Sequence, residues 1–94
     1  MSKWNDTLAK SSVTEFTRGE FLAYVTAFFN SEWDDEEDRD THARHFKRLV
    51  FPDPRGRDLI YWPEAGVEDT PEGVVGQVEK FRRENGLPGF REVG

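Results

Sequence analysis

Residues 58–63 of the chain read Asp58-Leu59-Ile60-Tyr61-Trp62-Pro63. This apolar segment is too short for an ordinary helix, since charged residues and a glycine flank it at 55–57 and again at 64–66. Asp58 is suited to cap a single helical turn, and Pro63 lacks the N–H group that would continue the helix. The segment therefore predicts one helical turn between two loops.

One turn can bury Leu59 and Ile60, but it cannot hide Tyr61 and Trp62 as well. A lone aromatic residue in such a turn more often fills the core. Two adjacent aromatic residues on a short rigid element are instead typical of a protein-binding anchor, because Tyr and Trp are enriched among interface hot spots. We therefore expect at least one of the two rings to be exposed.

The first of two helices predicted before this turn covers roughly residues 17–30. It begins with a capping box, in which the Thr17 hydroxyl accepts a hydrogen bond from a free backbone N–H and Glu20 reaches back. Apolar residues then recur at helical spacing, with Tyr24 at the flank of the buried face. The stripe that we expect in the core comprises Phe21, Leu22, Val25, Phe28 and Phe29.

The second helix is predicted from residue 34 or 35 to Val50, followed by Pro52 and Pro54 in the loop 51–57. Its acidic residues gather in the first turns and its basic residues in the last, the order that the helix dipole favours. Its inward stripe is thin, so we expect the first half to contribute little to the core and to be an exposed functional surface. That stripe comprises Ala43, Phe46, Leu49 and Val50.

The last helix is predicted to begin at Thr70 and Pro71, an N-cap followed by a proline at the first helical position. Asn85-Gly86 ends it. Its core stripe comprises Val74, Val75, Val78 and Phe81. No stretch alternates with a period of two, so the fold class is all-α. We expect residues 1–14 to form a polar, frayed N-terminal tail, touching the body only through Leu8 or Val13, and residues 15–94 to form a single helical domain.

The length and composition fit one domain with a modest core, since 35% of the 94 residues are hydrophobic and 34% are charged. The chain has no cysteine, which excludes disulfides, thiolate zinc sites and thiol nucleophiles. No stretch approaches the roughly 20 apolar residues of a membrane span, and the apolar part of a signal peptide is missing. We therefore expect a cytoplasmic protein that does not engage a membrane.

The formal net charge of −6 is concentrated in one segment. Residues 32–40 contain seven acidic residues and one arginine, whereas the rest of the chain contains twelve acidic and twelve basic residues. A compact negative patch argues against nucleic acid as a direct ligand and favours a basic partner.

Catalytic machinery is missing, since the sequence lacks the motifs of hydrolases, metalloproteases and nucleotide-binding enzymes. His42 and His45 could share a metal with Asp38 or Thr41, but we favour solvated residues on a helix face. Residues 34–40 lack the central glycine and final glutamate of an EF-hand loop. Exposed acids without an apolar pocket do not acquire the raised pKa of a general acid. We expect no catalytic residue, no metal site and no cofactor.

Two classes of function remain at this point. One is a binding protein that uses an acidic helix beside an aromatic anchor to engage a basic partner. The other is a small acidic helical interaction module of a larger assembly, without enzymatic activity. A tight heterodimer would favour the first class, and a stable homo-oligomer of the isolated chain would favour the second.

Four segments resemble the immunity proteins of nuclease colicins and pyocins. Two of them are similar to the family's S-D-L-I-Y-Y-P segment and, after an acidic loop, its S-P-x-G-[IV]-V helix. The others are similar to its W-R-x-x-x-G-x-x-G-F tail and to its first helix. The segments read Arg57-Asp58-Leu59-Ile60-Tyr61-Trp62-Pro63, Glu68-Asp69-Thr70-Pro71-Glu72-Gly73-Val74-Val75, Phe81-Arg82-Arg83-Glu84-Asn85-Gly86-Leu87-Pro88-Gly89-Phe90, and Phe16-Thr17 with Glu20-Phe21-Leu22. The likeness covers residues 15–94.

The resemblance implies a distorted antiparallel four-helix bundle whose third helix is very short. It also implies an inhibitor that is a monomer when free and forms a 1:1 heterodimer with the nuclease domain of its cognate bacteriocin, an HNH-type DNase. Such an inhibitor binds beside the active site, excludes DNA by bulk and negative charge, and protects the producing cell.

The resemblance also implies roles for individual residues. The short third helix supplies the shared anchor, which maps to Asp58, Tyr61 and Trp62. The second helix selects among toxins through positions that map to Glu36, Arg39, Asp40, Ala43 and Lys47. The charges that this helix exposes add Glu37 and Arg44 to the expected specificity residues. The chain departs from the family at Trp62, where relatives have a second tyrosine, and in the loop 51–56.

Overall fold

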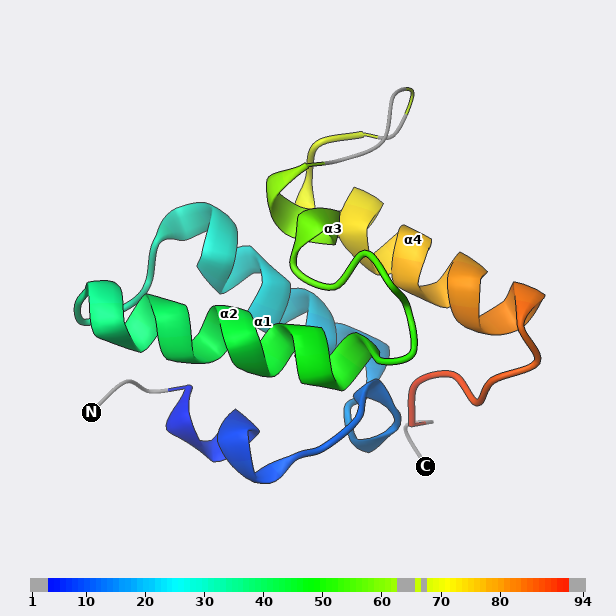
Figure 1. The fold of residues 1–94 in the computed structure, drawn as a ribbon, viewed down its shortest axis with the longest axis horizontal. Coiled ribbons are helices and arrows are strands. Elements are labelled where there is room, and N and C mark those ends of the chain that lie inside the picture. Colours follow the sequence, from blue (N-terminus) through cyan, green and yellow to red (C-terminus); the bar gives the residue numbers. More distant parts are fainter. Residues whose placement is uncertain (1–3, 63–65, 67, 92–94) are drawn as a thin grey trace.

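The computed structural model describes residues 4–62, 66 and 68–91, and this part of the chain contains helices and loops but no strand. Four α-helices form a distorted antiparallel bundle (Figure 1): α1 (Arg18–Asn30), α2 (Glu36–Val50), α3 (Asp58–Tyr61) and α4 (Pro71–Glu84). Two 3-10 helices, η1 (Asn5–Ala9) and η2 (Val13–Glu15), precede them. The predicted all-α fold with a very short third helix is confirmed. The predicted stop at Pro63 and part of the acidic loop after it lie outside the described residues.

Side-chain caps begin the three long helices, and those at Thr17 and Thr70 were predicted. Thr17 Oγ1 accepts a hydrogen bond from the Glu20 N–H at 3.1 Å, and a Glu20 carboxylate oxygen accepts one from the Thr17 N–H at 2.8 Å. At the start of α2, Asp35 Oδ1 accepts from the Asp38 N–H at 2.8 Å. The Thr70 hydroxyl accepts from a backbone N–H in the first turn of α4. These bonds satisfy donors that a helix start leaves without partners.

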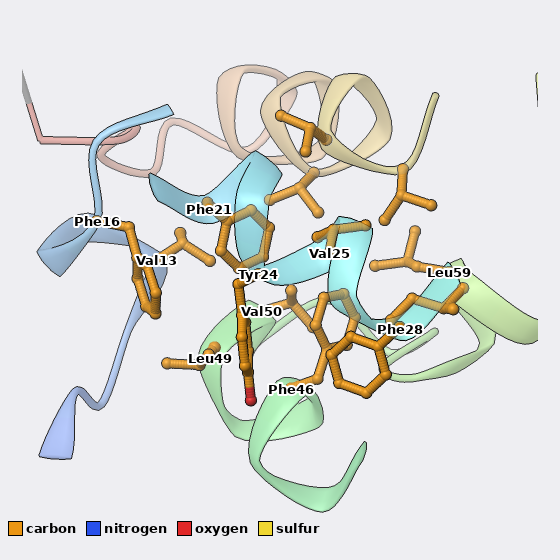
Figure 2. Packing of buried hydrophobic residues seen from close by; sticks show 14 of the residues in the cluster. Val13, Phe16, Phe21, Tyr24, Val25, Phe28, Phe46, Leu49, Val50 and Leu59 are labelled. Atoms are coloured by element: carbon orange, nitrogen blue, oxygen red, sulfur yellow. The ribbon is translucent and has the colours of Figure 1, made fainter. Parts of the chain in front are cut away.

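The core lies around α1, which contacts α2 and α4 in different ways. The backbones of α1 and α4 approach each other extensively, because α4 presents valine side chains to the core. Towards α2 the contact is made by long aromatic side chains (Figure 2). The Phe46 ring lies 5.8 Å from that of Phe21 and 5.7 Å from that of Phe28, measured between centroids.

The prediction that Tyr24 lies at the flank of α1 is wrong. Its side chain is completely buried and points from α1 towards α2 (Figure 2). Four aromatic rings surround it, with centroids between 5.4 and 6.2 Å away, and they belong to Trp4, Phe16, Phe28 and Trp33. Two of these rings come from the segment before α1, which covers the face that the periodicity of α1 alone leaves open.

The prediction that His42 and His45 are solvated is also wrong, since both are buried. His42 Nδ1 lies 2.7 Å from the Tyr24 hydroxyl, its Nε2 lies 3.6 Å from an Asp38 carboxylate oxygen, and its ring stacks on Trp33. His45 Nε2 donates to the Thr7 carbonyl oxygen at 2.7 Å. The histidines therefore join α2 to α1 and to the N-terminal segment. The described residues contain no group of three or more side chains placed to hold a metal ion.

The N-terminal segment is not frayed over the residues that the structure describes. Thr7 and Val13 are buried, and the Trp4 ring packs on the core cluster, whereas Leu8 is 37% exposed. Figure 1 shows this segment running along the edge of α2 opposite α3. The sequence hides this packing because its apolar residues follow no regular period. In the part of the chain described here, no helix is long and apolar enough to cross a membrane.

Acid should destabilise this fold through His42. Burial lowers the pKa of His42, as does His45, while the Asp38 carboxylate raises it, so the native ring stays neutral below its ordinary value of 6.5. The unfolded chain then binds a proton that the native state does not, and stability falls as the pH drops through that window. One such group changes the free energy of unfolding by at most about 1.4 kcal/mol per pH unit.

Urea denaturation between about pH 7.5 and about pH 5.5 measures this dependence, because the lowered carboxylate pKa values of Glu15 and Glu20 act below that range. His42→Gln is the control, since glutamine has similar polarity but does not titrate. We expect a shallower pH dependence in this variant than in the wild type. Identical slopes would show that His42 is not the source.

Candidate partner-binding site

A hollow of about 370 Å³ lies between α2 and α3. Its lining comprises Arg39, Asp40, Ala43, Arg57, Asp58, Tyr61 and Trp62. All three residues expected to form the anchor line it, as do three of the residues expected to select the partner. Two segments that are 14 or more residues apart in the sequence therefore form one continuous surface.

The turn α3 exposes its two aromatic residues to solvent because its other face is packed into the core. Leu59 and Ile60 are 5% and 7% exposed and belong to the core cluster, whereas Tyr61 is 45% and Trp62 is 76% exposed. One turn of helix places consecutive side chains roughly 100° apart, so residues 59 and 60 cannot point inward together with residues 61 and 62. The predicted exposure of the aromatic pair is confirmed.

Asp58 does not cap the turn, and that prediction is wrong. It is the first helical residue, its carbonyl oxygen accepts from the Trp62 N–H at 2.8 Å, and the capping position belongs to Arg57, which makes no side-chain cap. Among the described residues the Asp58 carboxylate makes no hydrogen bond or ion pair. Its acceptor capacity is therefore available to a partner, which suits the anchor role.

The loop between α2 and α3 is held by a polar clamp that sequence analysis missed. The Asp53 carboxylate is buried and accepts from Arg55 Nε at 3.0 Å and from Nη2 at 2.7 Å. Arg55 Nη1 in turn donates to Gln77 Oε1 on α4 at 3.1 Å. The loop is therefore fastened to α4, and α3 follows it directly. The Asp-x-Arg spacing is a local signal that could have indicated this pairing.

Gly56 completes the loop and lies against the Lys47 side chain. Its φ angle is +52°, a backbone conformation that residues other than glycine rarely adopt. A Cβ atom at this position would lie 3.0 Å from Lys47 Cγ. The Lys47 side chain therefore lies over the loop that leads into α3, beside Arg57 of the hollow but not among its lining residues.

The first half of α2 is exposed as predicted, but two of its acidic residues have structural roles. Asp35 caps the helix, and Asp38 is half-buried, where one carboxylate oxygen accepts from the Asp34 N–H at 3.2 Å and the other faces His42. Glu36 lies on the side of the hollow and, with Arg39, also lines a neighbouring depression that reaches Trp33. The two hollows share Arg39, so the candidate surface is continuous from α3 to the α1–α2 loop.

Glu37 and Arg44 lie outside this surface. They are displaced roughly 100–120° around the helix from Ala43, at 3.6 residues per turn. Arg44 instead lines a separate hollow beside the N-terminal segment, together with Leu8, Thr41, His45 and Arg48. The seven specificity residues predicted from the sequence therefore divide into five at or beside the α2–α3 hollow and two facing elsewhere.

The hollow carries charges of both signs. Burial raises the pKa of the Tyr61 hydroxyl, and so does Asp40, while Arg39 and Arg57 act in the opposite direction. Two guanidinium groups and two carboxylates thus surround one half-exposed phenol. Sequence analysis did not single out Arg57, because the sequence does not indicate in which direction a basic side chain next to a predicted turn points.

Comparisons with known proteins place this chain among proteins of similar sequence and fold. Residues 13–84 match the family model described as colicin immunity protein / pyocin immunity protein. The pyocin-S1 and pyocin-S2 immunity proteins of Pseudomonas aeruginosa are each 38% identical over 85 residues, covering 87% of this chain and 97% of the relative.

Two solved structures share the fold along nearly the whole chain. A chain of the complex between the mutant nuclease domain of pyocin S8 and its cognate immunity protein matches with a TM-score of 0.79 and 31% identity, covering 88% of this chain and 100% of that chain. A chain of the pyocin AP41 DNase–immunity complex matches with a TM-score of 0.76 and 34% identity, covering 89% and 100%.

Trp62→Ala should change the free energy of unfolding of the free protein by no more than about 0.5 kcal/mol, because the side chain is 76% exposed. Leu59→Ala is the control on the same turn. Its side chain is 5% exposed, so its loss should cost about 2–5 kcal/mol. Urea denaturation compares the two variants. Equal destabilisation would place the Trp62 ring in the core.

Proposed function

The chain belongs to the colicin and pyocin immunity protein family, and we propose that it binds and inhibits the nuclease domain of a cognate bacteriocin, so that the producing cell survives. It acts by forming a 1:1 complex and not by catalysis. The free protein is a monomer in the cytoplasm of the producing cell, where the toxin is made.

The observation that carries this proposal is the meeting of an exposed aromatic pair with charged residues of α2 in one hollow. Tyr61 and Trp62 leave the core on a turn whose inner face is fully packed. Asp58, Tyr61 and Trp62 form the anchor that would be common to related complexes. Arg39, Asp40 and Ala43, with Glu36 and Lys47 beside them, would select the toxin.

The charge of the chain suits inhibition of a nuclease from a position beside the active site. A nuclease domain binds phosphate backbones and is therefore basic, which favours attraction of a protein with a net charge of −6. Once bound, the exposed acids of α2 repel the phosphates of DNA. The size and the negative charge of the bound inhibitor together would keep DNA out of the nuclease active site, although no side chain of the inhibitor enters that site.

A cleavage assay tests the proposed function. The chain is mixed in increasing amounts with the nuclease domain of the bacteriocin encoded beside it, and DNA cleavage is followed. Cleavage should disappear at one equivalent, and the nuclease domains of pyocins S8 and AP41 serve as non-cognate comparisons. Full cleavage at a large molar excess of this protein would falsify the proposal.

Alanine at Tyr61 or Trp62 should each weaken binding of the nuclease by about 2–4 kcal/mol, the range of central hot spots. Phe51→Ala is a matched control, because Phe51 is 74% exposed, almost as much as Trp62 at 76%, but does not line the hollow. Isothermal titration calorimetry compares the three variants. A loss for Phe51→Ala as large as for Trp62→Ala would move the anchor away from α3.

Asp40→Lys should weaken cognate binding strongly, since a like charge placed in an interface costs several kcal/mol. Glu37→Lys makes the same change of charge on the same helix, but outside the hollow, and should have a much smaller effect. Dissociation constants for both variants are measured against cognate and non-cognate nucleases. Equal losses would mean that only the overall charge of α2 matters, and not the position of Asp40.

A further inference from the structure

We propose that the hollow between α2 and α3 receives a carboxylate side chain of the nuclease domain, bound by Arg39, Arg57 and the Tyr61 hydroxyl. The inference rests on the proposed function and names the chemistry that the partner must present at this point. It gives Arg57 a role in specificity, and it requires an acidic residue at the centre of a surface that is otherwise basic.

The two arginines approach the hollow from different elements. Arg39 lies on α2, and Arg57 lies at the capping position of α3, eighteen residues later. The side chain of Arg39 is 50% exposed, and its Nε lies 4.0 Å from an Asp40 carboxylate oxygen, which is too far for a hydrogen bond. Arg57 is exposed and makes no ion pair among the described residues. Most of their donor groups are therefore free to bind an acceptor.

Tyr61 brings a third donor to the same place. Both guanidinium groups lie close enough to its phenol to oppose the rise in pKa that burial causes. Because this pKa remains above its ordinary value of 10.0, the hydroxyl keeps its proton at neutral pH and can donate a hydrogen bond. Two cations and one O–H group thus face one hollow of about 370 Å³, which exceeds the size of a carboxylate.

The energetics of complex formation favour an acid as the occupant. When a partner covers the hollow, the two guanidinium groups lose water, and a buried charge without a counter-charge costs several kcal/mol. A basic side chain placed there would add repulsion. A carboxylate instead matches the planar guanidinium group with paired, charge-assisted hydrogen bonds. Asp40 and Asp58 line the same hollow and can pair with basic residues of the partner that surround the carboxylate.

The first test is a set of charge reversals that each change the net charge of the protein by −2, because one arginine is replaced by one glutamate. Arg39→Glu and Arg57→Glu make this change in the hollow between α2 and α3. Arg44→Glu and Arg48→Glu make it in the hollow beside the N-terminal segment. Long-range attraction to a basic nuclease is therefore changed alike in all four. Circular dichroism and urea denaturation check that these exposed substitutions leave the fold intact.

Dissociation constants for the cognate nuclease are then measured by calorimetry. We expect Arg39→Glu and Arg57→Glu to raise the constant roughly 30-fold or more, and the two controls to change it less than about 3-fold. The inference is overturned if all four variants bind alike. If the wild type neither binds nor inhibits the nuclease, the proposed function itself fails, which separates the two outcomes.

The second test identifies the acid on the partner. Each exposed Asp and Glu of the nuclease domain is changed to Lys in turn. The affinity of each nuclease variant is then compared between the wild-type inhibitor and its Arg57→Glu variant. One such nuclease variant should bind the wild type poorly and recover affinity for Arg57→Glu. If no acidic position shows this reciprocal change, backbone carbonyl groups satisfy the arginines and the inference is wrong.

Discussion

The hollow proposed as the binding site depends on the hydrogen bond between the Tyr24 hydroxyl and His42 Nδ1, at 2.7 Å in the centre of an aromatic cluster. Neither group has access to solvent in the free protein, so losing one partner would leave the other unpaired at a cost of about 1–3 kcal/mol. The bond therefore fixes the rotation of α2 against α1. With His42 turned inward, Arg39 and Ala43 on the adjoining side of the helix face α3, and the hollow exists because this rotation is fixed.

A second constraint acts from the other end of the hollow. The turn α3 has only four residues and cannot be stable alone, because an isolated turn does not recover the cost of nucleating a helix. It is held by the burial of Leu59 and Ile60 and by the clamp of Asp53 and Arg55 on α4. The anchor is thus rigid before any partner arrives, which lowers the entropic cost of binding.

The sequence predicts much of what neighbouring residues decide. The capping box at Thr17, the N-cap Thr70 and the short turn at 58–61 follow from neighbouring residues, and the structure has them, although Asp58 does not cap that turn. It fails where distant segments meet. His42 appears solvated until the residues before α1 and in the α1–α2 loop enclose it, and those segments have no periodicity from which their packing could be inferred. Arg57 is missed for the same reason, because only the relative position of α2 and α3 makes it part of a site.

In the first half of α2, the residues that fix the helix in place differ from the residues that it exposes to solvent. Its first half is fixed by a cap at Asp35, by Asp38 and by the buried His42, and not by the exposed residues 36, 39 and 40. Residues 36, 39 and 40 can therefore change at little cost to folding. The acidic composition of this half attracts any basic partner from a distance, and that attraction does not distinguish one nuclease from another. If the chain inhibits a nuclease as proposed, discrimination must come from the local arrangement, which in this chain sets two arginines among the acids. On that proposal, net charge governs the encounter, whereas the order of charges in the hollow decides which encounter persists.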